Sequence, residues 1–123
     1  MAKQQILIVD DNPNMSSLLS EMLEIFDFSS QRAGNGQEAL DILTKEKFSM
    51  VITDLRMPEM SGSELLRNIK QNYPDLPVVV ISGYSLAEEE DTLMADMADG
   101  FINKPFKMVH IEKLLQRFFK ASF

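Results

Sequence analysis

Charged and hydroxyl residues follow four short apolar segments of this sequence, and their types suit phosphate and metal chemistry. In chain order the pairs are Ile6–Val9 with Asp10 and Asp11, Met50–Thr53 with Asp54, Val78–Ile81 with Ser82, and Phe101–Asn103 with Lys104. Carboxylates bind hard cations and can accept a phosphoryl group covalently. Hydroxyl and ammonium groups contact phosphate oxygens. The set therefore suggests phosphoryl transfer beside a cation, provided that the fold brings these segment ends together.

Three carboxylates in one site would repel each other. Two unit charges about 4 Å apart cost roughly 1 to 4 kcal/mol at effective dielectric constants from 80 down to 20. Protonating one carboxyl group or binding a cation would relieve the repulsion. Oxygen ligands suit Mg²⁺, whereas the sequence has no Cys and only one His to favour Zn²⁺. Asp54 is the best phosphoacceptor, because the loop 55–62 can leave its side chain presented at the crevice.

Alternating strand and helix patterns must position these residues. The runs Ile6–Val9, Met50–Thr53 and Val78–Ile81 are rich in Val and Ile, which is typical of buried parallel strands. Phe28–Ala33 and Phe101–Asn103 are weaker strand candidates. Segments with apolar residues at three- and four-residue steps lie between them, with expected helix starts at Asn12–Pro13, Asn35–Gly36, Ser61 or Ser63, Ser85, and shortly before Val109. This alternation predicts an α/β fold with a parallel sheet covered on both faces. Ligands of such sheets bind beyond the carboxyl ends of the strands.

Composition narrows the class of protein. The 123 residues fit one domain, and the absence of cysteine excludes disulfides and thiolate metal sites. The formal net charge of −7, with scattered basic residues, argues against direct nucleic-acid binding. No apolar run approaches the ~20 residues of a membrane span. We therefore expect a cytoplasmic protein that does not enter the membrane.

The ordered set of residues resembles the receiver domain of two-component response regulators over nearly the whole chain. The residues that carry the resemblance are Asp10-Asp11, the stretch Asp54-Leu55-Arg56-Met57-Pro58 with Gly62, Ser82, and Lys104-Pro105-Phe106. The resemblance implies a flavodoxin-like (βα)5 three-layer sandwich with five parallel strands in the order 2-1-3-4-5. It also implies that residues 1–123 form a single receiver domain, with no output domain in this chain.

The resemblance assigns a role to each matched residue. Asp54 would be the phosphoacceptor, with Mg²⁺ held by Asp10, Asp11, Asp54 and the backbone carbonyl of Arg56. Ser82 and Lys104 would contact the phosphoryl group, Ser82 and Phe101 would switch conformation, and the Lys104–Pro105 peptide bond would be cis. Arg56 and Tyr84 stand where such domains tune dephosphorylation, and both are large enough to hinder attacking water.

Three positions depart from the family pattern. Gly83 follows the hydroxyl residue where a small alanine is usual, and Met97-Ala98 stands where Gly-Ala is usual. Phe101 lacks the hydroxyl group of a tyrosine, so it can signal by packing but not by a hydrogen bond. None of these departures removes the acceptor set.

The resemblance also implies partners. A histidine kinase or a histidine phosphotransfer protein would donate the phosphoryl group. A downstream protein or output domain would read the surface of helix 4, strand 5 and helix 5. The chain would be a monomer or a phosphorylation-dependent dimer. It would not be an enzyme with turnover, but a phosphoacceptor that assists its own phosphorylation and slow dephosphorylation.

Three alternatives share the fold class or the chemistry. A Mg²⁺-dependent aspartyl phosphatase of the haloacid dehalogenase type would carry a second acid two residues after its nucleophile. Counted from Asp10, that position is Asn12, and no insertion provides a substrate cap. A flavin carrier would have a Ser/Thr/Gly phosphate cradle in the first loop, where residues 10–14 are acidic instead. A protein-interaction module that works without phosphate would not need the complete Asp/Ser/Lys set.

Overall fold

A five-stranded parallel sheet forms the centre of the molecule in a computed structural model, which describes residues 4–54, 62–82, 98–103 and 106–119. The strands are β1 (Gln5–Val9), β2 (Ser29–Ala33), β3 (Met50–Asp54), β4 (Val78–Ser82) and β5 (Gly100–Asn103). Their spatial order is β2-β1-β3-β4-β5, and every pair is parallel. The predicted fold class and strand order are therefore confirmed.

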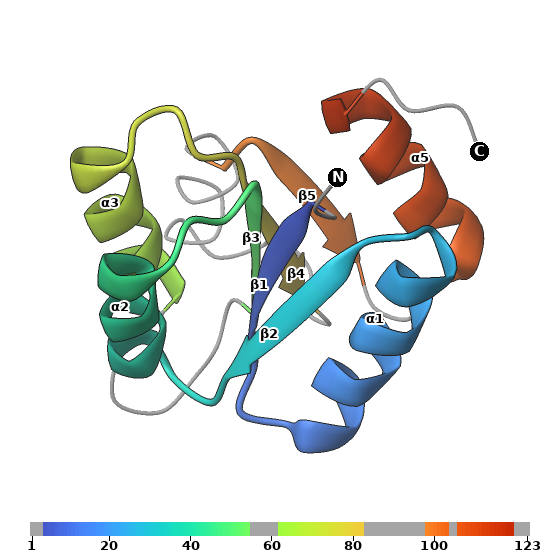
Figure 1. The fold of residues 1–123 in the computed structure, drawn as a ribbon, viewed down its shortest axis with the longest axis horizontal. Helices are drawn as coiled ribbons and strands as arrows, with labels where there is room; N and C mark the ends of the chain where they lie inside the picture. Colours follow the sequence, from blue (N-terminus) through green and yellow to red (C-terminus); the bar gives the residue numbers. More distant parts are fainter. Residues whose placement is uncertain (1–3, 55–61, 83–97, 104–105, 120–123) are drawn as a thin grey trace.

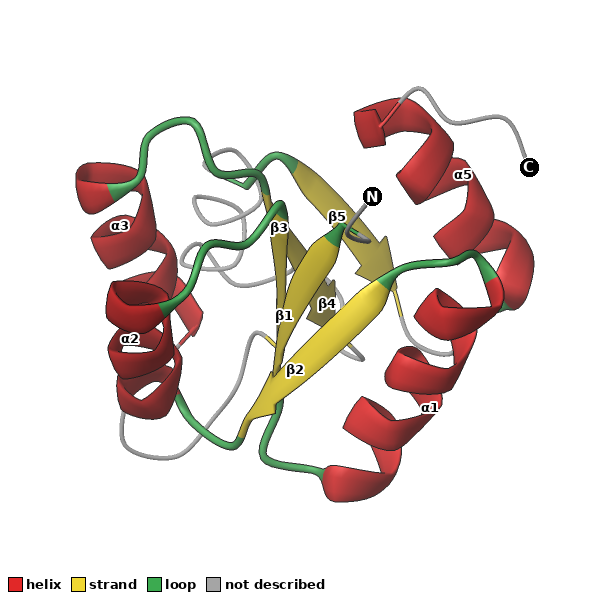
Figure 2. Cartoon of the chain, in the orientation of Figure 1, coloured by secondary structure: helices red, strands yellow, loops and turns green. Residues whose placement is uncertain are grey.

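Helices cover both faces of this sheet. They are α1 (Pro13–Ile25), α2 (Gly36–Lys45), α3 (Gly62–Asn72) and α5 (Met108–Phe119). α1 and α5 lie on one side of the sheet, and α2 and α3 lie on the other (Figure 1; Figure 2). The helix expected between β4 and β5 falls outside the described residues. No helix among the residues that the structure describes is long and apolar enough to cross a membrane.

Asparagine side chains begin the first two helices, as predicted. The Asn12 side chain accepts hydrogen bonds from the backbone N–H groups of Asn14 (3.0 Å) and Met15 (3.3 Å). The Asn35 side chain accepts one from Glu38 N–H at 2.8 Å. Each bond satisfies a helix donor that has no partner within the helix. Both caps follow directly on a strand–helix loop, so they fix where each loop leaves the sheet.

The core has two halves, one on each face of the sheet. Alternate residues of the central strands point to opposite faces, so Ile6 and Ile8 pack with α1 and α5 while Leu7 and Val9 pack with α2 and α3. These four side chains are fully buried, as expected for a parallel strand covered on both sides. β1 therefore lies in the middle of a rigid layer, and its last residue leads directly into the acidic loop.

The chain between α1 and β2 differs from the predicted strand Phe28–Ala33. Phe28 N–H donates to Leu23 O at 2.9 Å, and Asp27 N–H donates to Glu24 O at 3.0 Å. These two bonds form a Schellman motif, which closes the helix with Asp27 at φ 68°. Phe28 therefore belongs to the helix terminus, and β2 begins one residue later, at Ser29.

Candidate functional site

Three carboxylates meet at the carboxyl edge of the sheet. One carboxylate oxygen from each of Asp10, Asp11 and Asp54 lies within 4.8 Å of the other two. Asp10 is buried, Asp54 is half-buried and Asp11 is exposed, so the cluster runs from the end of the core to the solvent. The structure thus brings together the three acids that the sequence singled out.

Strand pairing explains why these acids meet. β1 and β3 pair in register, with Val9 opposite Thr53, so Asp10 and Asp54 follow neighbouring positions of adjacent strands. Asp10 N–H donates to Ala33 O at 3.0 Å, which prolongs the contact with β2 beyond the end of β1. Asp10 and Asp54 are therefore placed by the sheet itself, and Asp11 follows Asp10 in the loop that leads to α1.

Local hydrogen bonds orient the groups around the cluster. Asp10 Oδ1 accepts a hydrogen bond from Asn12 N–H at 2.9 Å. Asn12 is also the residue whose side chain caps α1. The fully buried Thr53 donates from Oγ1 to Asp54 O at 3.0 Å. The loop that carries Asp10 and Asp11 is thus tied to the start of α1. The backbone carbonyl of Asp54 is held by Thr53, its neighbour in β3.

The spacing of the carboxylates is compatible with a divalent cation. Mg²⁺ binds oxygen at 2.0–2.1 Å, so two of its ligands lie at most about 4.2 Å apart. The three oxygens, which lie within 4.8 Å of one another, would have to move closer by side-chain rotation, because neighbouring ligands of an octahedral ion are only about 2.9 Å apart. Oxygen-only donors suit Mg²⁺ better than zinc or copper. The donor set therefore fits the predicted cofactor.

The remaining predicted site residues are described only in part. Ser82 ends β4 and is paired with Asn103 of β5, but its side chain lies outside the described part of the chain. Arg56, Tyr84, Lys104 and Pro105 lie outside the described residues, so the predicted cis peptide bond stays a prediction. Because Asp54 pairs with Ile81, the backbone of Ser82 is at the same edge of the sheet as the acids.

Phe101, the predicted switch residue, lies on β5 opposite Val80. Its side chain is half-buried and packs against the half of the core that α2 and α3 cover. Its neighbour Ile102 packs against the other half, beneath α5. Phe101 is therefore a partly exposed side chain at the edge of the core, and its role in switching stays a prediction.

A pocket beside the acids contains a residue that the sequence did not single out. Its volume is about 410 Å³, and its lining residues are Asp10, Asp11, Pro13, Ser16, Arg32, Ala33 and Gly34. Arg32 comes from the edge strand β2, and its Nη1 atom donates to Ser17 Oγ at 2.6 Å. No spacing signal in the sequence connects Arg32 with the acids, because its proximity depends on β2 lying beside β1.

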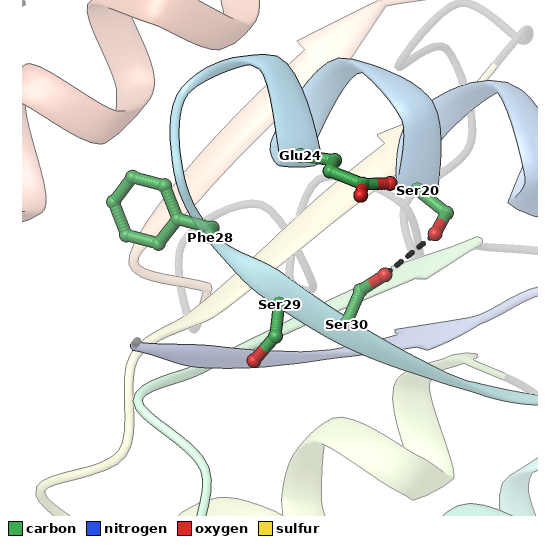
Figure 3. A pocket seen from close by; sticks show the side chains of 5 residues that line it. All are labelled: Ser20, Glu24, Phe28, Ser29 and Ser30. Atoms are coloured by element: carbon green, nitrogen blue, oxygen red, sulfur yellow. Dashed lines mark hydrogen bonds between the residues drawn. The ribbon is translucent and has the colours of Figure 1, made fainter. Parts of the chain in front are cut away.

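A second, smaller pocket lies between α1 and β2, and its lining is rich in hydroxyl groups (Figure 3). Its volume is about 210 Å³, and the lining residues are Ser20, Glu24, Phe28, Ser29 and Ser30. The Ser20 and Ser30 hydroxyl groups are hydrogen-bonded to each other at 2.7 Å. This bond joins the helix to the strand, and the pocket shares no lining residue with the acidic cluster.

Comparisons with known proteins agree with this fold. Residues 6–116 match the response regulator receiver domain family, so the chain belongs to that family of two-component signalling domains. It is 32% identical to the response regulator protein PilR of Pseudomonas aeruginosa, over 94% of this chain and 26% of PilR. It is 33% identical to the sensor histidine kinase RcsC of Escherichia coli, over 89% of this chain and 12% of RcsC.

The solved structures give the same result. The response regulator protein TrrA of Thermotoga maritima, in complex with Mg²⁺-BeF, has a TM-score of 0.85 and is 29% identical. The alignment covers 94% of this chain and 98% of that structure. By contrast, this chain spans only about a quarter of PilR and about an eighth of RcsC. The shared part is therefore the receiver domain and not the whole of those relatives.

Proposed function

We propose that this domain is a phosphorylation-dependent switch in which Asp54 accepts a phosphoryl group from a histidine kinase or a histidine phosphotransfer protein. The observation that carries the proposal is the close approach of the Asp10, Asp11 and Asp54 carboxylates at the end of a receiver-domain sheet. Such domains occur both in response regulators and in a sensor kinase among the relatives. Both kinds of relative are consistent with a phosphohistidine donor.

Mg²⁺ is the cofactor that this donor set would take. Asp10, Asp11 and Asp54 would hold it together with the Arg56 carbonyl, and Asp10 would contribute either directly or through water. When bound, it supplies positive charge against the oxygens of the transferred group. The complex of TrrA with Mg²⁺-BeF supports this assignment by similarity.

The transfer itself needs little acid–base chemistry. An Asp54 carboxylate oxygen attacks phosphorus, and a new O–P bond forms. The P–N bond of the donor phosphohistidine breaks, or the P–O bond of acetyl phosphate, and its electron pair leaves with the donor. Asp54 is held at the end of β3 by strand pairing, so its side chain is positioned before the donor arrives.

The signal would follow from the charge and acceptor oxygens that the phosphoryl group adds. Ser82 and Lys104 contact these oxygens, Phe101 changes its packing, and the surface of helix 4, β5 and α5 is altered for a downstream partner. A complete shift of a two-state equilibrium requires about 5.5 kcal/mol. Two or three charge-assisted hydrogen bonds of roughly 1.5 to 3 kcal/mol each would supply most of it.

Intact-mass measurement after incubation with acetyl phosphate tests the proposal. We expect wild type to gain one phosphoryl group in the presence of Mg²⁺ and none after chelation. Asp54→Asn should gain none, because an amide oxygen does not form the acyl phosphate. Asp75→Asn is the matched control, since Asp75 is an exposed carboxylate of the loop before β4.

The outcomes separate the rival functions. Labelling of Asp54→Asn to the wild-type level would refute the acceptor assignment. Steady release of phosphate from small phosphate esters would instead indicate a Mg²⁺-dependent aspartyl phosphatase. Failure of wild type to accept phosphate from either acetyl phosphate or phosphohistidine donors, with partner binding unchanged, would indicate an interaction module that works without phosphate.

A further inference from the structure

The opposite, amino-terminal edge of the sheet holds an ionic contact between α3 and the residue that precedes β5. Lys70, near the end of α3, pairs through Nζ with Asp99 Oδ2. The same Nζ atom donates a hydrogen bond to Leu76 O at 3.0 Å. The Lys70 and Asp99 side chains are 23% and 35% exposed, so the contact is partly shielded from solvent. α3, the loop before β4 and the start of β5 are thus joined at one point.

Asp99 also binds the first residue of β4 twice. Its backbone N–H donates to Val78 O at 2.8 Å, and its Oδ2 atom accepts from Val78 N–H at 2.8 Å. The side chain therefore takes the place of a strand carbonyl at this position of the ladder. Because both bonds depend on Asp99 standing opposite Val78, any displacement of β5 along β4 would break them.

β5 gains more from such an anchor than the central strands do. Like β2, it lies at an edge of the described sheet, and it pairs with β4 over four positions, whereas β2 pairs with β1 over five. Phe101 and Ile102 pack on opposite faces, which opposes a slip of one residue, because a slip would exchange the faces. Packing alone, however, does not prevent the first residues of β5 from separating from β4. It also does not prevent β5 from shifting along β4 by less than one residue.

β5 links this anchor to the functional edge. Asp99 and Asn103 are four residues apart, which is roughly 13 Å of strand. Phe101 lies between them, and Lys104 follows Asn103 directly in the sequence. The acids Asp10, Asp11 and Asp54, in contrast, are carried by β1 and β3, which do not pair with β5.

We infer that Asp99, held by Lys70, is a positioning residue that fixes β5 along β4 and thereby places Phe101 and Lys104 for phosphoryl transfer. The inference rests on the proposed function for its link to Lys104. According to this inference, the contacts of Asp99 at the amino-terminal edge of the sheet control the rate of phosphoryl transfer. The cation site, in contrast, is positioned by β1 and β3. Transfer rate and Mg²⁺ affinity should therefore respond differently when the anchor is removed.

The test compares Asp99→Ala with wild type in two measurements. We expect the rate constant of phosphorylation by acetyl phosphate, at saturating Mg²⁺, to fall at least about fivefold, because small misplacements of a catalytic group slow a reaction strongly. The Kd for Mg²⁺ without donor should stay within about twofold of wild type, because the acids are distant from the substitution. A purely structural loss would change both constants together.

Three further variants refine the result. Asp99→Asn keeps an oxygen that can accept from Val78 N–H and should restore most of the rate. Lys70→Met removes the ammonium group but keeps the apolar stem, and should give an intermediate rate. Asp75→Ala removes an exposed carboxylate near the same edge and should behave as wild type. An unchanged rate in Asp99→Ala, or a parallel loss of Mg²⁺ affinity, would overturn the inference.

Amide hydrogen exchange tests the anchor independently of phosphorylation. In Asp99→Ala, the amides of β5 should exchange about tenfold or more faster, while those of β1 stay protected, because local opening is no longer opposed at the start of the strand. Unchanged exchange in β5 would overturn the anchor even if the wild type is phosphorylated. Failure of wild type to label, with faster β5 exchange in the variant, would refute the proposed function alone.

Discussion

At the scale of single residues, the acidic cluster carries an electrostatic cost. Asp10, Asp11 and Asp54 are close enough for their charges to repel, and Asp10 is buried. Asn12 N–H offsets part of this cost by donating to Asp10. The exposed Asp11 has least contact with the protein interior. A cation bound among the three carboxylates would reduce their mutual repulsion, which is the physical reason for expecting one here.

Replacing Asp11 tests whether a cation binds among the three carboxylates. We expect Asp11→Asn to weaken Mg²⁺ binding by about tenfold or more, because it removes one of three negative charges and a hard oxygen ligand. Isothermal titration with Mg²⁺ measures the effect. Asp41→Asn on the exposed face of α2 serves as the control, since it removes the same single negative charge away from the cluster. Equal affinity of Asp11→Asn and wild type would remove Asp11 from the site.

At the scale of secondary-structure elements, the ends of helices determine where the sheet loops begin. Asn12 and Asn35 start α1 and α2 directly after the loops that follow β1 and β2. At the other end of α1, the Schellman motif turns the chain so that buried Phe28 packs against Phe119 of α5, with ring centroids 5.0 Å apart. Both ends of α1 are thus closed by hydrogen bonds, and its carboxyl end packs against α5.

Asp27 carries the strain of this turn. Its φ of 68° is in the left-handed region, which favours glycine. We expect Asp27→Gly to raise the free energy of unfolding by about 1 kcal/mol and Asp27→Ala to lower it by a similar amount. Urea denaturation measures both values. Glu21→Gly, at an exposed position within α1, should instead cost about 1 kcal/mol. Destabilisation by Asp27→Gly would contradict this account.

At the scale of the whole molecule, the net charge of −7 and the clustered acids lead us to expect that stability depends on cations. A ligand that binds only the folded state stabilises it by about 2.7 kcal/mol at one hundred times its Kd. We therefore expect the thermal midpoint of the wild type to rise with Mg²⁺ concentration and to rise less in Asp11→Asn. NaCl at equal ionic strength is the control. Equal shifts with both salts would indicate general screening and not a site.

Much of this organisation could be predicted from local patterns. Short Val- and Ile-rich runs alternating with helical spacing define a parallel sheet, and the carboxyl ends of its strands must share one edge. Asp10, Asp11 and Asp54 were expected together for that reason. The starts of α1 and α2 were also predicted, because an asparagine cap acts within three residues of itself.

The remaining features depend on residues that are distant in sequence. Lys70 and Asp99 meet because α3 ends beside the start of β5, and neither residue stands in a pattern that indicates the other. Arg32 lines the pocket of Asp10 because β2 is the neighbour of β1. The sequence predicts Phe28 in a strand because the residue is apolar, whereas its backbone N–H bonds to Leu23 O at the end of α1.

The amino-acid sequence by itself thus determined the order of the elements, the strand-end acids and the family that they indicate. Tertiary structure decided which side chains meet across elements. Examples are the contact of Lys70 with Asp99, the position of Arg32 in the lining of the acidic pocket, and the packing of Phe101. The physical reason is that periodicity and capping are local properties of the chain. Contacts between elements instead depend on how the two halves of the core pack the helices against the sheet.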